Sequence, residues 1–219
     1  MAVLYINRLL HVCFCQCFLF LYVFTSIVMK RLVFIDSTMR SESRTRKIAG
    51  PLIAELSKKY EIYTIRLDGE DFPAVNSSIL KDRDKGIVPE RYAEMARIIA
   101  SADRIAISAP FWDMSFPSAL KVFIENMSLF HITFDSDETH CYGLCKCEKV
   151  LYVTTRGMNI RTGDILEQAT PYLRALSNLW GLGELYVVSA ENMDYSTPEE
   201  IEIKIKETIE EGLTICRDF

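Results

Sequence analysis

Residues 31–45 read RLVFIDSTMRSESRT, and this stretch decides the fold. Its first part, Arg31–Ser37, is a short apolar run that ends in turn-forming residues, as buried parallel strands do. A hydroxyl-rich turn follows. Ser43–Tyr60 then predicts a helix, because apolar residues such as Ile48 and Leu52 recur four positions apart on one face. A strand that passes through a polar turn into a helix is the opening of a βα unit.

The same alternation continues to the end of the chain. Further strands are predicted at Glu61–Leu67, Arg104–Ser108, Lys149–Thr154 and Leu185–Ser189. Further helices are predicted at Pro89–Ala102, Pro117–Ser128, Gly163–Leu179 and Pro198–Cys216. Five strands alternating with five helices predict an α/β fold, namely a three-layer, doubly wound, five-stranded parallel sheet.

Two local features complicate this pattern. Gly50-Pro51 lies inside the first predicted helix, and a proline in a helix interior costs about 3 kcal/mol. We therefore expect a kink or a short break there. The stretch from Leu67 to Gly86 is polar and is predicted to be a loop.

Composition restricts the class of protein. The chain has 219 residues, of which 49% are hydrophobic and 25% charged, with a net charge of -5. That composition is globular, and the acidic balance argues against a nucleic-acid partner, which requires clustered Lys and Arg. The seven cysteines are odd in number and irregularly spaced. They do not form the disulfide framework of a secreted protein, so we expect reduced thiols and a cytoplasmic location.

Residues 1–28 form a hydrophobic leader that precedes a domain spanning residues 29–219. From Leu9 to Val28 the only acidic or basic residue is His11, and the run is long enough to cross a bilayer. A misassigned start, with translation beginning at Met29, is the favoured interpretation. A membrane anchor is the second, and Lys30 with its basic neighbour would then keep the domain in the cytoplasm. A secretory signal ranks last, because no small-x-small cleavage site is present.

Three loops that follow strands one, three and four are predicted to share the ligand-binding edge of the sheet. The first, STMRSESRT at 37–45, offers hydroxyls, basic side chains and a helix N-terminus, all of which suit a phosphate. The alternative is a simple N-cap by Ser41 or Ser43. Because a GxGxxG fingerprint is absent, a mononucleotide is favoured over a dinucleotide.

The second loop, APFWDMSFPS at 109–118, places two aromatic residues and a methionine just beyond a strand end. Loops run over the surface, so such side chains are expected to cover a flat ligand. The third loop, TTRGM at 154–158, contains a glycine that permits close backbone approach to a ligand.

Together, S-x5-S-R-T, APFWDMSFPSALK and TTRG resemble the FMN-dependent NADH azoreductase and NAD(P)H quinone oxidoreductase family of flavodoxin-like proteins, over roughly Lys30 to Tyr195. The resemblance implies FMN as cofactor, NADH or NADPH as electron donor, and a small flat electron acceptor such as a quinone, azo dye or nitroaromatic. It further implies a ping-pong cycle and a homodimer with the flavin site at its interface.

The resemblance also implies roles for individual residues. The FMN phosphate would be held by Ser37, Ser43, Arg44 and Thr45. The flavin ring would be lined by Pro110, Phe111, Trp112, Asp113 and Met114. Its pyrimidine side would be met by Thr155, Arg156 and Gly157. The acceptor pocket would include Phe116, His131, Phe134 and Met158. Asp113 stands where the family usually has asparagine, and Met158 where a second glycine is common. No catalytic side chain is assigned, because the cofactor performs the chemistry.

Other functions are compatible with parts of the sequence. A non-catalytic electron carrier or redox-sensing module is the main alternative to an enzyme. A phospho-receiver domain ranks far behind, since only Asp36 and Asp113 are available for its acidic cluster. A zinc site formed by His140, Cys141, Cys145 and Cys147 is weakly supported by their spacing. These cysteines are instead expected to be packing residues, and no metal is predicted.

Overall fold

The computed structural model describes residues 29–219, and its centre is a parallel sheet with the strand order β2-β1-β3-β6-β7. The strands are β1 (Lys30–Asp36), β2 (Tyr60–Arg66), β3 (Arg104–Ser108), β6 (Lys149–Thr155) and β7 (Glu184–Ala190). All four pairings are parallel. The strand order reverses between β1 and β3, so a ligand site is expected beyond their carboxyl ends.

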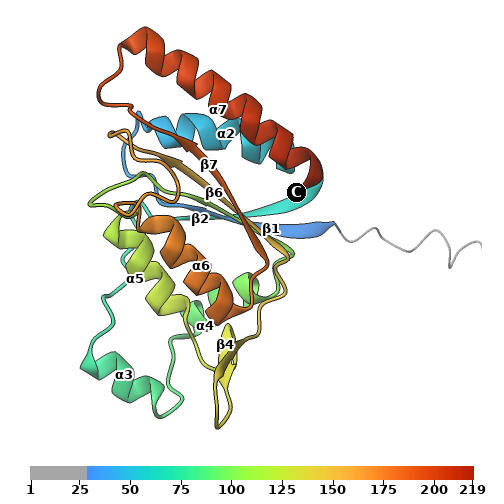
Figure 1. Ribbon diagram of the computed structural model, residues 1–219. Coiled ribbons are helices and arrows are strands. Elements are labelled where there is room, and N and C mark those ends of the chain that lie inside the picture. Colours follow the sequence, from blue (N-terminus) through green and yellow to red (C-terminus); the bar gives the residue numbers. More distant parts are fainter. Residues whose placement is uncertain (1–28) are drawn as a thin grey trace, which may run out of the picture.

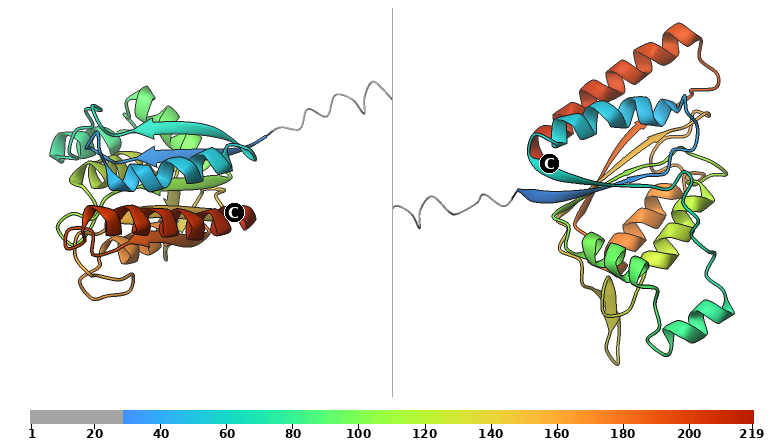
Figure 2. Two further views of the ribbon diagram at one scale, coloured as in Figure 1. Left: turned by 90° about the horizontal axis from the view of Figure 1, so that it is seen from above. Right: turned by 180° about the vertical axis from the view of Figure 1, so that it is seen from behind.

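Helices cover both faces of the sheet, as Figures 1 and 2 show. One face carries α2 (Arg44–Leu56) and α7 (Pro198–Asp218), while the other carries α4 (Glu90–Ala100), α5 (Ser118–Met127) and α6 (Ala169–Trp180). Side chains alternate between two cores along each strand. Leu32 belongs to the core under α2 and α7, and Val33 to the core on the other face. The predicted three-layer fold is therefore confirmed.

The prediction of a break at Pro51 was wrong, because α2 continues through it. Pro51 lies on the exposed side of the helix, where the carbonyls can still bond to water. The opposite side is fixed by packing: Leu52 is fully buried and contacts Gly212 of α7 so closely that an added Cβ there would lie 2.7 Å from it. Burial of this apolar face outweighs the cost of one missing hydrogen bond.

Three other elements differ from the sequence prediction. The expected loop before Gly86 contains α3 (Ser77–Arg83), which is capped by the side chain of Asn76 and stands apart from the sheet in Figure 1. A hairpin of β4 (Phe134–Ser136) and β5 (Cys141–Gly143) was not predicted.

Helix α6 begins at Ala169 rather than Gly163, because the Glu167 carboxylate accepts a hydrogen bond from the Thr170 backbone N–H at 2.9 Å. This side chain satisfies a donor of the first turn.

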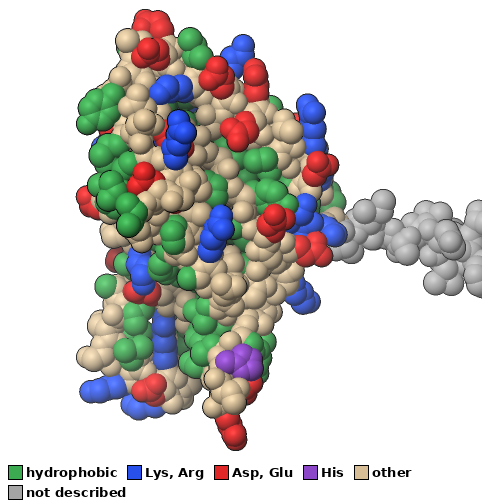
Figure 3. Space-filling model, in the orientation of Figure 1, with side chains coloured by type: hydrophobic (Ala, Val, Ile, Leu, Met, Phe, Trp, Pro, Cys, Tyr) green, Lys and Arg blue, Asp and Glu red, His purple; other side chains and the backbone are tan. Residues whose placement is uncertain are grey.

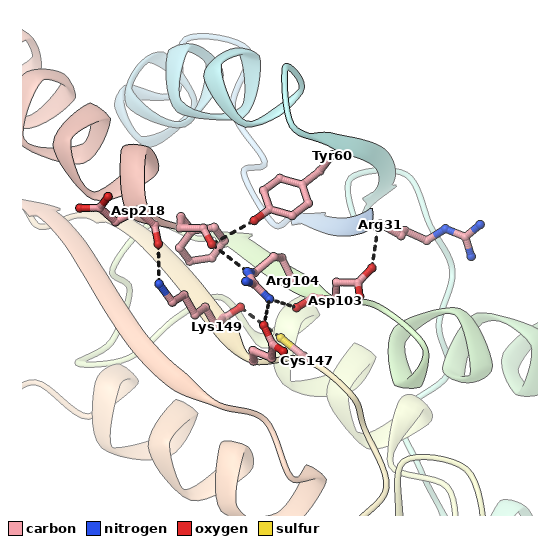
Figure 4. A network of polar contacts seen from close by, with 9 residues as sticks. Arg31, Tyr60, Asp103, Arg104, Cys147, Lys149 and Asp218 are labelled. Atoms are coloured by element: carbon pink, nitrogen blue, oxygen red, sulfur yellow. Dashed lines mark hydrogen bonds and ion pairs between the residues drawn. The ribbon is translucent and has the colours of Figure 1, made fainter. Parts of the chain in front are cut away.

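The amino ends of the strands are closed by the chain terminus (Figure 4). The Arg104 guanidinium donates to the Phe219 carbonyl at 2.8 Å and to the Glu148 carboxylate at 2.7 Å. The Tyr60 hydroxyl also donates to the Phe219 carbonyl, at 3.0 Å. Main-chain and side-chain groups from the sheet and the C-terminus thus pair with one another at this end.

The surface carries both signs of charge. Figure 3 shows Lys and Arg side chains interspersed with Asp and Glu on the face in view. The predicted leader at 1–28 lies outside the described residues. No helix within residues 29–219 combines the length and apolar character that a bilayer crossing requires.

Candidate functional site

A cavity of about 410 Å³ opens beyond the carboxyl ends of the strands. Its walls come from the loops that follow β1, β3, β6 and β7. The lining residues are Met39, Arg40, Glu42, Ser43, Arg44, Thr45, Pro110, Phe111, Trp112, Thr155, Gly157, Met193 and Asp194. The three loops singled out from the sequence therefore meet in one place, at the reversal of strand order.

One end of the cavity is the N-terminus of α2. Ser43 is the N-cap, and its hydroxyl accepts a hydrogen bond from the Arg46 N–H at 3.2 Å. The remaining N–H groups of the first turn have no acceptor inside the helix, and they add to the positive end of the helix dipole. The Thr45 hydroxyl lies 2.7 Å from that of Thr155, which joins the loops after β1 and β6. This end is suited to a phosphate.

The first loop is held from below by Asp36. One oxygen of its buried carboxylate accepts hydrogen bonds from the Thr38 N–H, the Thr38 hydroxyl and the Ser108 hydroxyl. Ser37 was predicted to bind phosphate. Its side chain is fully buried, does not line the cavity, and has no hydrogen-bond partner within residues 29–219.

The other end of the cavity is aromatic. The Phe111 N–H donates to the Thr155 carbonyl at 3.1 Å, and the Arg40 guanidinium lies 5.9 Å from the centre of the Trp112 ring. Trp112 and Ser115 exchange two backbone hydrogen bonds of 2.9 Å around a tight turn. The two residues in that turn, Asp113 and Met114, have φ of 47° and 63°. Positive φ costs energy for a side chain such as methionine, so the turn is strained.

The structure places the Arg156 side chain differently from its prediction. The guanidinium is fully buried and points into the domain rather than into the cavity. It contacts the Glu191 carboxylate at 3.2 Å and the Thr162 hydroxyl at 2.9 Å. It therefore does not face a ligand's pyrimidine edge. Alternation along β6 was the overlooked signal, since residues 152, 154 and 156 share one side of the strand.

The loop after β7 completes the site and was missed by the sequence analysis. Met193 and Asp194 donate backbone hydrogen bonds of 3.0 Å to the carbonyls of Arg156 and Gly157. The Asp194 carboxylate forms a 2.8 Å ion pair with Arg44. It also lies 2.0 Å from where a Cβ on Gly157 would be, so glycine is needed for this approach. Gly157 could be noted in the sequence, but Asp194, which packs against it, lies in a distant segment of the chain.

The residues predicted for the acceptor pocket do not lie together within residues 29–219. Phe116 is buried in the core and packs edge-on against Tyr172 at 5.1 Å. His131 and Phe134 lie beyond the end of α5, at the opposite end of the sheet, where Phe134 is the first residue of the hairpin. Met158 is 37% exposed near the cavity but does not line it.

The cysteines near β6 have differing environments. Cys141 is exposed, whereas Cys147 is buried, and burial raises the pKa of the Cys145 and Cys147 thiols to about 12. Both thiols are neutral at physiological pH. Within residues 29–219 no three His, Cys, Asp or Glu side chains are grouped as metal ligands.

The residues that line the cavity fit the chemistry of FMN. A helix N-terminus with hydroxyls and Arg44 lies at one end, and the Phe111–Trp112 wall at the other. Its volume is within the range of cofactor pockets. Two carboxylates, from Glu42 and Asp194, balance the charges of Arg40 and Arg44 along the lining. Fold and site together define a doubly wound α/β protein with a mononucleotide-type cavity at its switch point.

The family follows from comparison with known proteins. A family model described as the flavodoxin-like fold matches residues 30–213, and the chain belongs to this family.

Named relatives support the predicted resemblance. The FMN-dependent NADH:quinone oxidoreductase 2 of Clostridium acetobutylicum is 28% identical over 206 residues, covering 87% of this chain and 100% of the relative. The FMN-dependent NADH:quinone oxidoreductase of Clostridium beijerinckii is 28% identical over 209 residues, with the same coverage. The similarity to quinone oxidoreductases is thereby confirmed.

Solved structures with the same fold include two from Bacillus anthracis. An azoreductase superimposes with a TM-score of 0.76 at 18% identity, covering 87% of this chain and 100% of its own. An FMN-dependent NADH-azoreductase in complex with FMN gives a TM-score of 0.71 at 21% identity, covering 86% and 100%. At these identities the likeness concerns the fold.

Proposed function

We propose that this protein is an FMN-dependent NAD(P)H oxidoreductase that reduces quinone, azo or nitroaromatic acceptors in a ping-pong cycle. The observation that carries the proposal is the single cavity at the switch point, with a phosphate-type end and an aromatic end. The names of its relatives, FMN-dependent NADH:quinone oxidoreductases, agree with that arrangement.

The phosphate end would be formed by Ser43, Arg44 and Thr45 at the start of α2. Backbone N–H groups of the first turn and the Arg44 guanidinium supply the donors. For Arg44 to turn to a phosphate, it must give up part of its ion pair with Asp194. That pair is exposed, so breaking it costs at most about 1 kcal/mol.

The ring end would be formed by Pro110, Phe111 and Trp112, with Thr155 and Gly157 opposite. When bound, FMN supplies the capacity to take up a hydride from a nicotinamide and to pass two electrons to a second substrate. The protein binds the cofactor and the substrates and orients them toward one another. Trp112 and Met114 remain 38% and 36% exposed, so the wall leaves room for a flat, electron-poor molecule to stack beside it.

We also propose a homodimer with a cytoplasmic location. Large apolar side chains on the loops near the cavity are exposed, among them Ile165 at 86%, Leu166 at 51% and Tyr195 at 75%. Such a surface is typical of an interface. The described cysteines are all unpaired with one another, which agrees with a reducing compartment.

Steady-state kinetics test the proposal. NADH is varied at several fixed concentrations of a benzoquinone with FMN-saturated protein, and the rate of NADH oxidation is recorded. Parallel double-reciprocal lines are expected for a ping-pong cycle. Intersecting lines would refute the ping-pong order. Protein that binds FMN but oxidises neither NADH nor NADPH would identify an electron carrier or sensor.

A further inference from the structure

Arg156 is a fully buried side chain near the cavity with several polar partners. Its guanidinium donates to the Ile160 carbonyl at 3.1 Å, the Thr162 hydroxyl at 2.9 Å and the Glu191 carboxylate at 3.2 Å, and it lies 4.0 Å from the Glu167 carboxylate. These partners belong to the segment before α6 and to the loop after β7. One side chain thus joins the loops that build this end of the domain.

The same guanidinium supports the aromatic wall. It lies 5.8 Å from the centre of the Phe111 ring. Phe111 lines the cavity, whereas Arg156 does not. A desolvated cation–π contact of this kind is directional, because the cation must lie over the ring face. Backbone contacts also hold the loop, since the Phe111 N–H donates to the Thr155 carbonyl.

Burial of this arginine is costly and is only partly compensated. Both Arg156 and Glu167 are fully buried. Several polar atoms around them have no hydrogen-bond partner within residues 29–219: Tyr152 Oη, Thr154 Oγ1, Arg156 Nε, Glu167 Oε2 and Thr170 Oγ1. A purely stabilising core would be better served by apolar side chains at these positions. The presence of the Arg156 charge at this buried position is explained by the loops and the Phe111 ring that its guanidinium contacts.

We propose that Arg156 is a positioning residue that orients the Phe111–Trp112 wall of the cavity, with Glu167 and Glu191 fixing its guanidinium from behind. The inference rests on the proposed function in so far as the wall receives the flavin ring. Arg156 itself touches neither cofactor nor substrate. Its effect on the site passes through the face of Phe111.

Arg104 offers a matched control at the other end of the sheet. It too is a buried arginine, lying 5.7 Å from the centre of the Tyr60 ring and paired with Glu148. It lines no part of the cavity. Arg104→Lys therefore measures what the loss of such an arginine does to the fold alone.

The first experiment is fluorine NMR of the full-length protein labelled with 5-fluorotryptophan. The chain has two tryptophans, Trp112 in the wall and Trp180 in the core, so two resonances are expected and Trp112→Phe assigns them. Arg156→Lys should shift or broaden the Trp112 resonance and leave that of Trp180 in place. Arg104→Lys should leave the Trp112 resonance unchanged.

A double variant keeps the test decisive if a single charge loss prevents folding. Arg156→Met with Glu167→Gln removes both fully buried charges together. The Glu191 carboxylate that remains is 26% exposed and still accepts a hydrogen bond from the Ser189 hydroxyl. It should alter Trp112 as Arg156→Lys does. An unchanged Trp112 resonance in a folded variant, or equal changes at both tryptophans, would overturn the proposal.

The second experiment compares FMN with riboflavin, which has the ring but lacks the phosphate. Arg156→Lys should weaken both by the same factor, about tenfold, because an ammonium cannot bond Thr162 and Glu191 as the planar guanidinium does while also lying against the Phe111 ring. Unchanged affinities for both would contradict the positioning role. If the wild-type protein binds neither compound, the proposed function fails, and the fluorine spectrum still decides whether Arg156 orients the wall.

Discussion

Each end of the sheet has a buried arginine that lies over an aromatic ring, but the two arginines stand in different surroundings. At the amino end, Arg104 lies over Tyr60 and pairs with Glu148; at the carboxyl end, Arg156 lies over Phe111 and pairs with Glu191. Ring distances are alike, at 5.7 Å and 5.8 Å. The difference lies in what surrounds each arginine.

The amino end is closed, because Phe219 lies there. Its carbonyl oxygen accepts hydrogen bonds from the Tyr60 hydroxyl and the Arg104 guanidinium. The carboxyl end is open, with a cavity, a strained turn and buried polar atoms that lack partners in the described part of the chain. A parallel sheet gathers its loops at one end, and function there is accommodated at some cost in stability. The amino end carries no ligand-binding loops, so its residues contribute to stability without that constraint.

The largest expected effect concerns the amino end at alkaline pH. Burial raises the pKa of the Cys147 thiol from 9.0 to about 12. Below pH 9 the folded and unfolded states both hold the proton, so this group leaves stability unchanged. Between pH 9 and 12 only the unfolded thiol ionises, and the free energy of unfolding falls, by an amount on the order of 4 kcal/mol at pH 12. Urea titrations from pH 8 to 11 check this, and Cys147→Ala should make the decline less steep, leaving the part that is due to Cys145. An equally steep decline in that variant would contradict the assignment.

The second effect separates stability from binding. Arg104→Met removes the donor to the Phe219 carbonyl and should lower the free energy of unfolding by about 2 kcal/mol. FMN affinity should not change, because the cavity lies at the other end of the sheet. Urea unfolding and flavin titration measure the two quantities on one preparation. A loss of FMN affinity in folded Arg104→Met protein would show that the ends are coupled.

The third effect is confined to the carboxyl end. Arg44→Met removes a charge beside the predicted phosphate position and should weaken FMN about tenfold, or about 1.4 kcal/mol, while riboflavin affinity stays constant. Lys47→Met is the matched control, since Lys47 lies on the same helix but pairs outward with Glu202 at 4.0 Å. Equal losses for both ligands would place the phosphate elsewhere.

The smallest effect tests the strained turn. Met114 has a φ of 63°, which glycine adopts freely, so Met114→Gly should raise the free energy of unfolding by about 1 kcal/mol. Gly86→Ala provides the reverse measurement, because Gly86 has a φ of 73° and no heavy atom within 4 Å of an added Cβ among the atoms described. Thermal unfolding of both variants should show shifts of opposite sign.

Much of the fold, and the loops that build the cavity, could be predicted from the sequence. Apolar runs located the strands, and the geometry of parallel sheets brought the loops at 37–45, 109–118 and 154–158 to one edge. Aromatic residues on a surface loop indicated the wall that Phe111 and Trp112 form in the cavity. These inferences depend on local patterns and on a general rule of topology, both of which are written in the order of residues.

What the sequence did not reveal depends on contacts between distant segments. Asp194 reaches Arg44 across the sheet, and the direction of the Arg156 side chain is set by carboxylates at 167 and 191. Pro51 remains within a helix because α7 packs on the opposite side. Two features were local and could have been recognised: the cap of α3 by Asn76 and the alternation along β6 that turns Arg156 inward.

The central claim is that the open end of the sheet binds FMN and passes electrons from NAD(P)H to a small acceptor. The most direct measurement is the visible absorbance spectrum of FMN-loaded protein before and after anaerobic NADH, followed by a quinone. The flavin bands should bleach with NADH, or with NADPH, and return with the quinone. Protein that cannot be loaded with FMN would contradict the account at its foundation, and loaded protein that ignores both donors would contradict the proposed activity.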